Sequence, residues 1–189
     1  MRRRSGGVRA TLAVLLALAA AGCSGGAPSP SPLPVATSAD EFAEAWCGSL
    51  EALARAIGNP DTAADSKLSA ALDAAITRGD YAGVEEVAAQ MKAELAIGRQ
   101  LASVAAGWPP GTAMAGQVDA LLRAVEVLVE TKRANATRGL GEADGAAQAA
   151  FEAAGGIEAW QGMFEAARSL PADATAGMDC RWWEAGAPD

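Results

Sequence analysis

The side chains that could do chemistry in this 189-residue sequence are three cysteines and many carboxylates, because the sequence contains no histidine. Without histidine there can be no Ser-His-Asp or Cys-His arrangement, and the commonest general base is missing. The Glu-x-x-His pairs of di-iron bundles and the His ligands of tetrahedral zinc are missing as well. No Gly-x-x-x-x-Gly-Lys phosphate loop occurs either. We therefore expect a protein that is not an enzyme and holds no metal or cofactor.

Several carboxylates lie close together at helical spacing. Paired carboxylates can bind a hard cation or share a proton. However, the chain carries 23 acidic and 15 basic side chains, so acidic residues are expected over its whole surface. We interpret the close pairs as solvated helix faces. They are Glu41 with Glu44, Glu85 with Glu86, and Glu126 with Glu130.

The first cysteine, Cys23, follows a segment with the three parts of a secretory signal. Arginines at positions 2, 3, 4 and 9 precede an apolar run over 12–21, and small residues end it. The apolar run is about half the ~20 residues that a membrane-spanning helix needs. The segment therefore predicts export rather than a transmembrane anchor.

The sequence Leu18-Ala19-Ala20-Ala21-Gly22-Cys23 resembles the lipobox of bacterial lipoprotein precursors, in which a small residue and glycine precede an invariant cysteine. The resemblance covers only the first 23 residues, and Ala20 stands where the family usually has leucine. It implies a signal peptide over 1–22, cleavage before Cys23, and acyl chains such as palmitate on Cys23. Two acyl chains suffice for stable anchoring. The resemblance thus implies a lipid anchor on the extracytoplasmic face of the cell membrane.

The remaining cysteines, Cys47 and Cys180, are an even pair in an exported chain, and we expect a disulfide between them. Two free buried thiols are the alternative. The bond would close a loop of more than a hundred residues, which the chain-entropy model values at up to roughly 5 kcal/mol.

The net charge of the mature chain argues against two classes of partner. Removal of residues 1–22 takes away four arginines and no acidic residue, so the net charge falls from −8 to −12. An acidic surface without basic clusters argues against nucleic acid as a partner. It also argues against electrostatic attachment to anionic lipid, so the acyl anchor must hold the chain at the membrane.

Residues 23–37 form the predicted lipid-anchored linker, and 38–189 the predicted helical domain. Proline and serine alternate over 28–32, a composition that favours an extended, solvated chain. At about 3.1 Å per residue the linker reaches on the order of 40 Å. We expect it to lift the domain off the membrane.

The domain reads as all-α, a four- to five-helix bundle. The first helix begins at Ser38 with Glu41 completing a capping box, and Gly58-Asn59-Pro60 ends it. Arg78-Gly79 ends the second, Asp80 caps the third, and the prolines after Trp108 break the chain before a fourth helix capped by Thr112. A last helical region, interrupted at Gly155-Gly156, ends before Pro171. No alternating β-branched runs occur, so no sheet is expected.

Two helices have apolar faces that we expect to be buried. The fourth helix is the most regular, with Met114, Val118, Leu121, Val125 and Leu128 at helical spacing. The last helical region carries Phe151, Ile157, Trp160, Phe164 and Ala167.

Tryptophans are the candidate partner-binding residues: Trp108 before two prolines, and the adjacent Trp182 and Trp183. Aromatic side chains on rigid loops often anchor interfaces. The alternative is that these rings cover the ends of the bundle.

These features favour a non-enzymatic, lipid-anchored binding module of the cell envelope. A carrier that holds a small apolar ligand between its helices is the second hypothesis, since alanine-rich faces could leave room for one.

Overall fold

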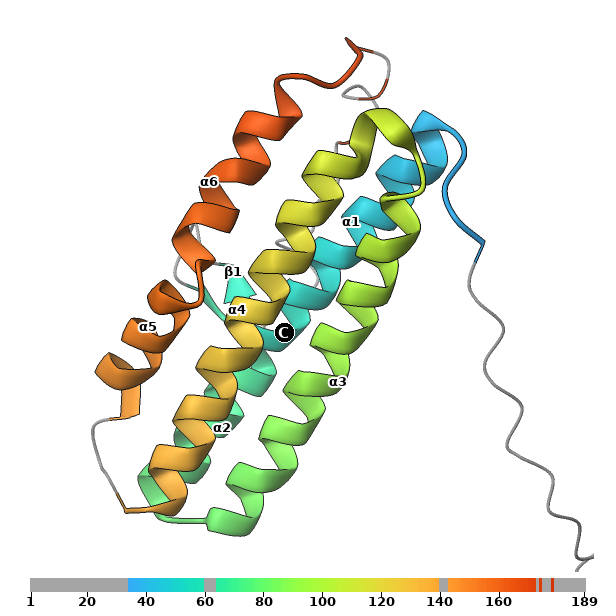
Figure 1. Cartoon of the computed structure of the whole chain (residues 1–189). Helices are drawn as coiled ribbons and strands as arrows, with labels where there is room; N and C mark the ends of the chain where they lie inside the picture. Colours follow the sequence, from blue (N-terminus) through green and yellow to red (C-terminus); the bar gives the residue numbers. More distant parts are fainter. Residues whose placement is uncertain (1–33, 60–63, 140–142, 173, 175–177, 179–189) are drawn as a thin grey trace, which may run out of the picture. The chain divides into compact units, whose positions relative to one another are not determined.

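The computed structural model describes residues 34–59, 64–139, 143–172, 174 and 178, all within one compact unit, Leu33–Asp189. The predicted all-α class is confirmed for this part of the chain (Figure 1). The sequence predicted four or five helices; the described part contains six, because the last helical region is two separate helices. The helices are α1 (Ala39–Ile57), α2 (Lys67–Arg78), α3 (Tyr81–Ala105), α4 (Thr112–Thr137), α5 (Ala143–Ala153) and α6 (Gly156–Ala167).

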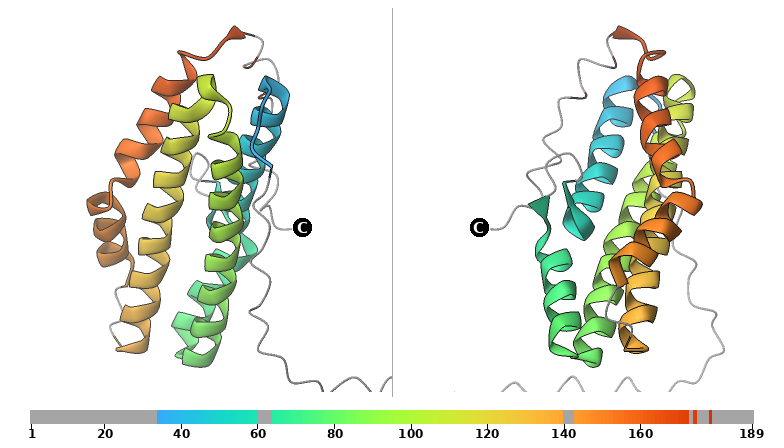
Figure 2. Two further views of the ribbon diagram at one scale, coloured as in Figure 1. Left: turned by 45° about the vertical axis from the view of Figure 1, so that its right-hand side comes forward. Right: turned by 90° about the vertical axis from the view of Figure 1, so that its left-hand side faces the viewer.

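The six helices lie in four rows. The two long helices, α3 and α4, have 25 and 26 residues, about 38 Å each at the α-helical rise, and pack side by side. Helices α1 and α2 follow one another along α3, and α5 and α6 follow one another along α4, as both views in Figure 2 show. Each shorter pair therefore substitutes for one long helix.

Capping explains where several helices begin. Ser38 accepts a hydrogen bond from the Glu41 backbone N–H at 3.2 Å, and Asp80 accepts one from Gly83 N–H at 3.0 Å, which confirms both predicted caps. The sequence reading missed Ser66, which caps α2 and donates its buried hydroxyl to Ala56 O at 2.8 Å. That single serine joins the start of α2 to the end of α1.

The prediction that Thr112 caps α4 was wrong. Gly111 occupies the cap position and makes no side-chain bond. The Thr112 hydroxyl instead donates to Ala106 O at 2.9 Å and Trp108 O at 3.3 Å. It bonds the Ala106 carbonyl just after the end of α3, across the short 3-10 turn Pro109–Gly111, while Trp108 O also accepts a bond from Gly111 N–H.

Glycine separates α5 from α6, as the sequence predicted. Gly155 adopts φ +79°, in the left-handed region that side chains disfavour. A side chain on Gly156 would overlap the ring of Phe151, so glycine lets that ring lie against the start of α6. The break lets both helices follow α4.

A small antiparallel pairing lies between α1 and α2, where we expected no sheet. It joins β1 (Gly58–Asn59) to β2 (Ala64–Asp65), with Gly58 opposite Asp65. A strand of two residues is too short to show the alternating pattern by which strands are recognised in a sequence.

Alanine makes up half of the buried apolar positions, so the helices pack closely. The predicted core face of α4 is confirmed: Met114, Val118, Leu121 and Val125 are buried, and Leu128 is half-buried. Helix α4 lies between α3 on one side and α5 and α6 on the other. It is the central helix of the bundle.

The apolar residues of the last helical region are only partly buried: Phe151, Trp160 and Ala167 pack against the core, whereas Ile157 and Phe164 do not. In α6 the side chains of Ile157 and Phe164 are 41% and 48% exposed, whereas Ala159 and Met163 are buried. The hydrophobic spacing is compatible with either face, and the small Ala159 side chain allows the closer approach to α4. Ile157 and Phe164 therefore lie largely in solvent, while Met163 is buried and Trp160 packs against the core.

The closest approach of three helices occurs at Gly98. A methyl group on Gly98 of α3 would lie 3.1 Å from Cδ1 of Leu122 and 3.2 Å from Cβ of Ala52. We expect Gly98→Val to lower the free energy of unfolding by about 1–3 kcal/mol, since overpacking forces neighbouring helices apart. Urea unfolding followed by circular dichroism checks this.

Gly116 is the matched control for Gly98. It lies in a helix, and a side chain there would meet nothing within 4 Å. Gly116→Val should change the free energy of unfolding by less than about 0.5 kcal/mol. Equal effects at the two glycines would show that helix propensity, not packing, decides the result.

Throughout the described segments, no helix combines the length and the apolar character that a bilayer span requires.

Candidate functional site

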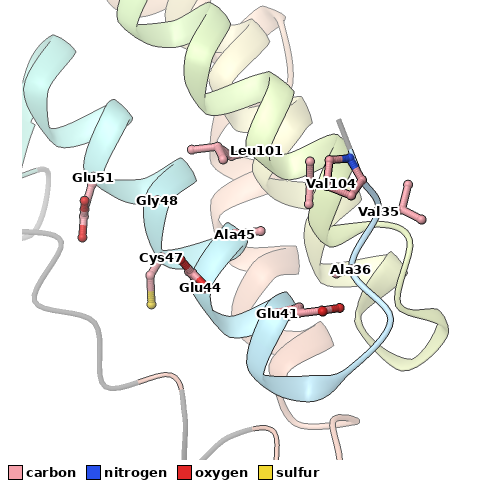
Figure 3. A pocket seen from close by; sticks show the side chains of 11 residues that line it. Val35, Ala36, Glu41, Glu44, Ala45, Cys47, Gly48, Glu51, Leu101 and Val104 are labelled. Atoms are coloured by element: carbon pink, nitrogen blue, oxygen red, sulfur yellow. The ribbon is translucent and has the colours of Figure 1, made fainter. Parts of the chain in front are cut away.

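The candidate site is an open groove of about 630 Å³ along the exposed side of α1 (Figure 3). Helix α1 contributes one edge, α3 contributes Leu101 and Val104, and the chain before α1 contributes the third side. Such concave surfaces with mixed apolar and polar lining are where proteins usually bind ligands. The described lining residues are Pro34, Val35, Ala36, Glu41, Glu44, Ala45, Cys47, Gly48, Glu51, Leu101 and Val104.

Backbone pairing holds the N-terminal side of the groove in place. Ala36 is buried, and its N–H donates to Val104 O at 3.0 Å. The neighbouring Val35 leaves 57% of its surface exposed. The end of the predicted linker is therefore packed on the domain, and it presents an aliphatic side chain at the groove.

Leu101 forms the floor between the two helices. A side chain on Gly48 would come within 2.9 Å of Leu101 Cδ1, so glycine at this position lets α3 reach the edge of α1. The groove owes its depth to this missing side chain. Together Val35, Leu101 and Val104 make one wall aliphatic.

Carboxylates line the other wall. Glu44 pairs with no cation among the described residues, and Glu51 lies 3.8 Å from Arg55, on the next turn of α1. Arg55 itself contacts Glu94 of α3 at 2.8 Å. Figure 3 shows Glu41, Glu44 and Glu51 along one side of the same helix. The groove thus has one aliphatic and one acidic side.

Glu41 has a structural partner. Its Oε2 accepts hydrogen bonds from the Thr37 backbone N–H at 2.6 Å and from the Thr37 hydroxyl at 2.9 Å. These bonds favour the ionised form and hold the pKa of the Glu41 carboxyl below its usual range, the Thr37 backbone contributing most. Glu41 therefore fixes the start of α1 and keeps its charge in mildly acidic solution.

The Glu41 contact predicts a pH dependence of stability. A carboxyl whose pKa is lowered by folding stabilises the fold above its unfolded pKa of about 4.3, and that contribution is lost as the pH falls through the folded pKa. We expect Glu41→Gln to reduce the loss of stability between about pH 5 and that lower pKa. Thermal unfolding as a function of pH measures it.

Glu44→Gln is the control for Glu41→Gln. Glu44 lies one turn further along α1 and accepts no comparable hydrogen bond among the described contacts. Below about pH 5 the melting temperature of Glu41→Gln should therefore fall less steeply with decreasing pH than that of Glu44→Gln. Identical profiles would show that the bonds from Thr37 contribute nothing to stability.

Of the other carboxylates noted in the sequence, Glu85, Glu126 and Glu130 pair with basic side chains, whereas Glu86 accepts a hydrogen bond from Gln90 at 3.4 Å. Glu126 lies 3.1 Å from Arg99, and Glu85 lies 2.6 Å from Arg133. Arg133 also contacts Glu130; this contact lowers the pKa of the Glu130 carboxyl and contributes most to raising that of the Arg133 guanidinium. No group of three or more potential metal ligands occurs in the described part of the chain. These pairs connect α3 to α4.

Trp108 covers the end of the bundle. Its half-buried ring lies 5.1 Å from that of Phe42, at an interplanar angle of 38°, and Phe42 is fully buried. In the sequence analysis this position, over the end of the bundle, was given as the alternative to a partner-binding role. Trp108 is not among the described residues that line the groove.

Of the other predicted site residues, the structure describes only Cys47. Cys47 is half-buried and lies at the edge of the groove. Cys23, Cys180, Trp182 and Trp183 lie outside the described residues.

Sequence reasoning missed the groove itself. In the sequence analysis Glu41 and Glu44 were singled out as a pair, but Leu101 and Gly48 were not. Nothing in their spacing brings Leu101 beside Gly48, since 53 residues separate them and only the packing of α3 on α1 joins them.

Comparisons with known protein families, curated proteins and solved structures find no match to this chain. Its function has to be argued from the site itself.

Proposed function

We propose that this chain is a lipid-anchored protein of the extracytoplasmic face of the cell membrane, and that its helical domain binds a partner protein without catalysing a reaction. The anchor part of the proposal follows from the resemblance of residues 18–23 to a lipobox. The binding part is carried by one observation, the groove between α1, α3 and residues 34–36.

The groove suits recognition better than the other exposed apolar surface. Ile157 and Phe164 on α6 lie on a convex helix face, whereas Val35, Leu101 and Val104 form a concave surface with carboxylates opposite. A concave surface can exclude water around an inserted side chain, which concentrates binding energy in few contacts.

The groove also lies where the tether meets the domain. Residues 34–36 form its third side, and only about ten residues separate them from Cys23. An extended tether of that length reaches roughly 30 Å. A partner bound in the groove would therefore lie close to the membrane.

The pairing of Cys47 with Cys180 is part of the proposal. Cys47 is half-buried on α1, and the sequence offers only Cys23 and Cys180 as partners within the chain. Leu170, Ala174 and Met178 pack against the same core cluster as Trp46, which favours Cys180 as that partner. Alkylation of the denatured, unreduced protein tests the pairing. Both thiols should stay unmodified, and modification of both would exclude it.

The apolar-carrier hypothesis finds less support. Its ligand would lie between the helices, but at Gly98 the side chains of Ala52 and Leu122 already approach within 3.2 Å of where a single methyl group would stand. At that level of the bundle the interior is filled by the protein's own side chains.

Photo-crosslinking tests the proposed binding site. A benzophenone amino acid is placed at position 44, in the groove, and in the control at position 86, an exposed glutamate of α3 outside it. In intact cells the full-length protein should give a discrete crosslinked product from position 44 and none from position 86. Val35→Asp, which puts a charge on the aliphatic wall, should abolish that product. Crosslinks of equal yield from both positions would contradict the proposal.

A further inference from the structure

The charges around the groove indicate the chemistry of its partner. We infer that the groove takes a cationic peptide segment of a protein, one in which lysine or arginine side chains flank an aliphatic residue. This inference rests on the proposed function and concerns the same groove.

The first support is the spacing of the carboxylates. Glu44 and Glu51 are seven residues apart, which is about two turns or 10 Å along α1. An extended peptide repeats its side chains on one face every two residues, about 7 Å, so the long side chains of basic residues two positions apart can meet both carboxylates. The aliphatic side chain between them would face Leu101 and Val104.

The second support is the contrast with the rest of the surface. On α3 and α4, Asp119 lies 3.4 Å from Arg99, and Glu130 lies 3.5 Å from Lys92. Along the groove, none of the described lining residues is a lysine or an arginine. Arg55, the nearest cation to Glu51, is shared with Glu94 at a shorter distance. The carboxylates of the groove are therefore less neutralised than those paired between α3 and α4, and a cationic partner would balance them.

The third support is the aliphatic wall. The stems of lysine and arginine are apolar and lie along apolar surfaces while their charged ends reach water. Val35, Leu101 and Val104 offer such a surface in the same groove as the carboxylates. An acidic peptide, a nucleic acid or an anionic lipid headgroup would bring like charges together.

Two synthetic peptides serve as probes, acetyl-Gly-Lys-Leu-Lys-Gly-amide and the same peptide with glutamate at both lysine positions. Each carries a fluorophore, and fluorescence anisotropy follows its binding to the full mature protein in detergent. The lysine peptide should bind and the glutamate peptide should not. Binding should weaken as the salt concentration rises from about 0.05 to 0.5 M, because partly exposed charges are screened.

Paired variants locate the effect. The double variant E44Q/E51Q should weaken binding of the lysine peptide roughly ten-fold, since each exposed pairing contributes only a few-fold. The control E86Q/E152Q removes the same number of charges from exposed positions outside the groove. It should leave the affinity unchanged within about two-fold.

Three results would overturn the inference. Equal weakening by both double variants would show a response to net charge alone, and binding of the glutamate peptide would exclude cationic recognition. If position 44 still gives a crosslink that Val35→Asp abolishes, but the lysine peptide does not bind, the proposed function stands and the cationic partner is wrong. Failure of the crosslink itself would instead remove the proposed function.

Discussion

Phe42→Ala is expected to lower the free energy of unfolding by about 3–5 kcal/mol, the largest effect of any single core substitution that we predict. The Phe42 ring is fully buried and stacks on Trp108 at 5.1 Å. A side chain on Gly111 would overlap it, so the ring fills the space beneath the turn between α3 and α4. Truncation removes apolar contact and leaves a cavity that the turn cannot close. Urea unfolding followed by far-ultraviolet circular dichroism measures the change.

Phe164→Ala is the matched control, because it deletes the same ring from an exposed position. Phe164 is 48% exposed and contacts Trp160 edge to face, with ring centroids 5.3 Å apart. Its loss should cost less than about 1.5 kcal/mol, the upper range for an aromatic pair. A comparable loss from both variants would mean that the two rings are equally buried in solution, contrary to the structure.

Cys23→Ser is expected to abolish lipidation of the chain completely. The serine hydroxyl does not replace the cysteine thiol that carries the diacylglyceryl group in the lipoproteins whose lipobox this sequence resembles. Each acyl chain contributes about 0.8 kcal/mol of membrane affinity per buried methylene, so the anchor accounts for essentially all of the expected attachment. Metabolic labelling with an alkyne analogue of palmitate, followed by click detection, measures the acyl group directly.

Cys47→Ser provides the comparison for the labelling experiment. It removes a cysteine from the folded domain and leaves residues 18–23 intact, so its label should equal that of the unmodified protein. Intact mass of the membrane-extracted protein gives a second readout, which should correspond to residues 23–189 plus acyl chains. An unlabelled protein of unmodified mass, recovered from the culture medium, would disprove the anchor.

The sequence alone was sufficient for features that depend on neighbouring residues. The caps at Ser38 and Asp80, the ends of helices at Gly58 and Gly79, and the break at Gly155 are decided within one or two turns of the chain. Their hydrogen bonds and backbone angles involve residues three or four positions apart at most. The buried face of α4 was also predictable, because its neighbours on both sides enforce one broad apolar stripe.

Tertiary packing decided the features that join distant residues. The outward orientation of Ile157 and Phe164 follows from which face of α6 approaches α4 most closely, and small buried residues there outweigh large apolar ones. The groove exists because Gly48 admits Leu101 and because Ala36 pairs with Val104. The sequence shows which positions of a helix are apolar. Only the packing of helices that are far apart in the chain determines which of these positions are covered.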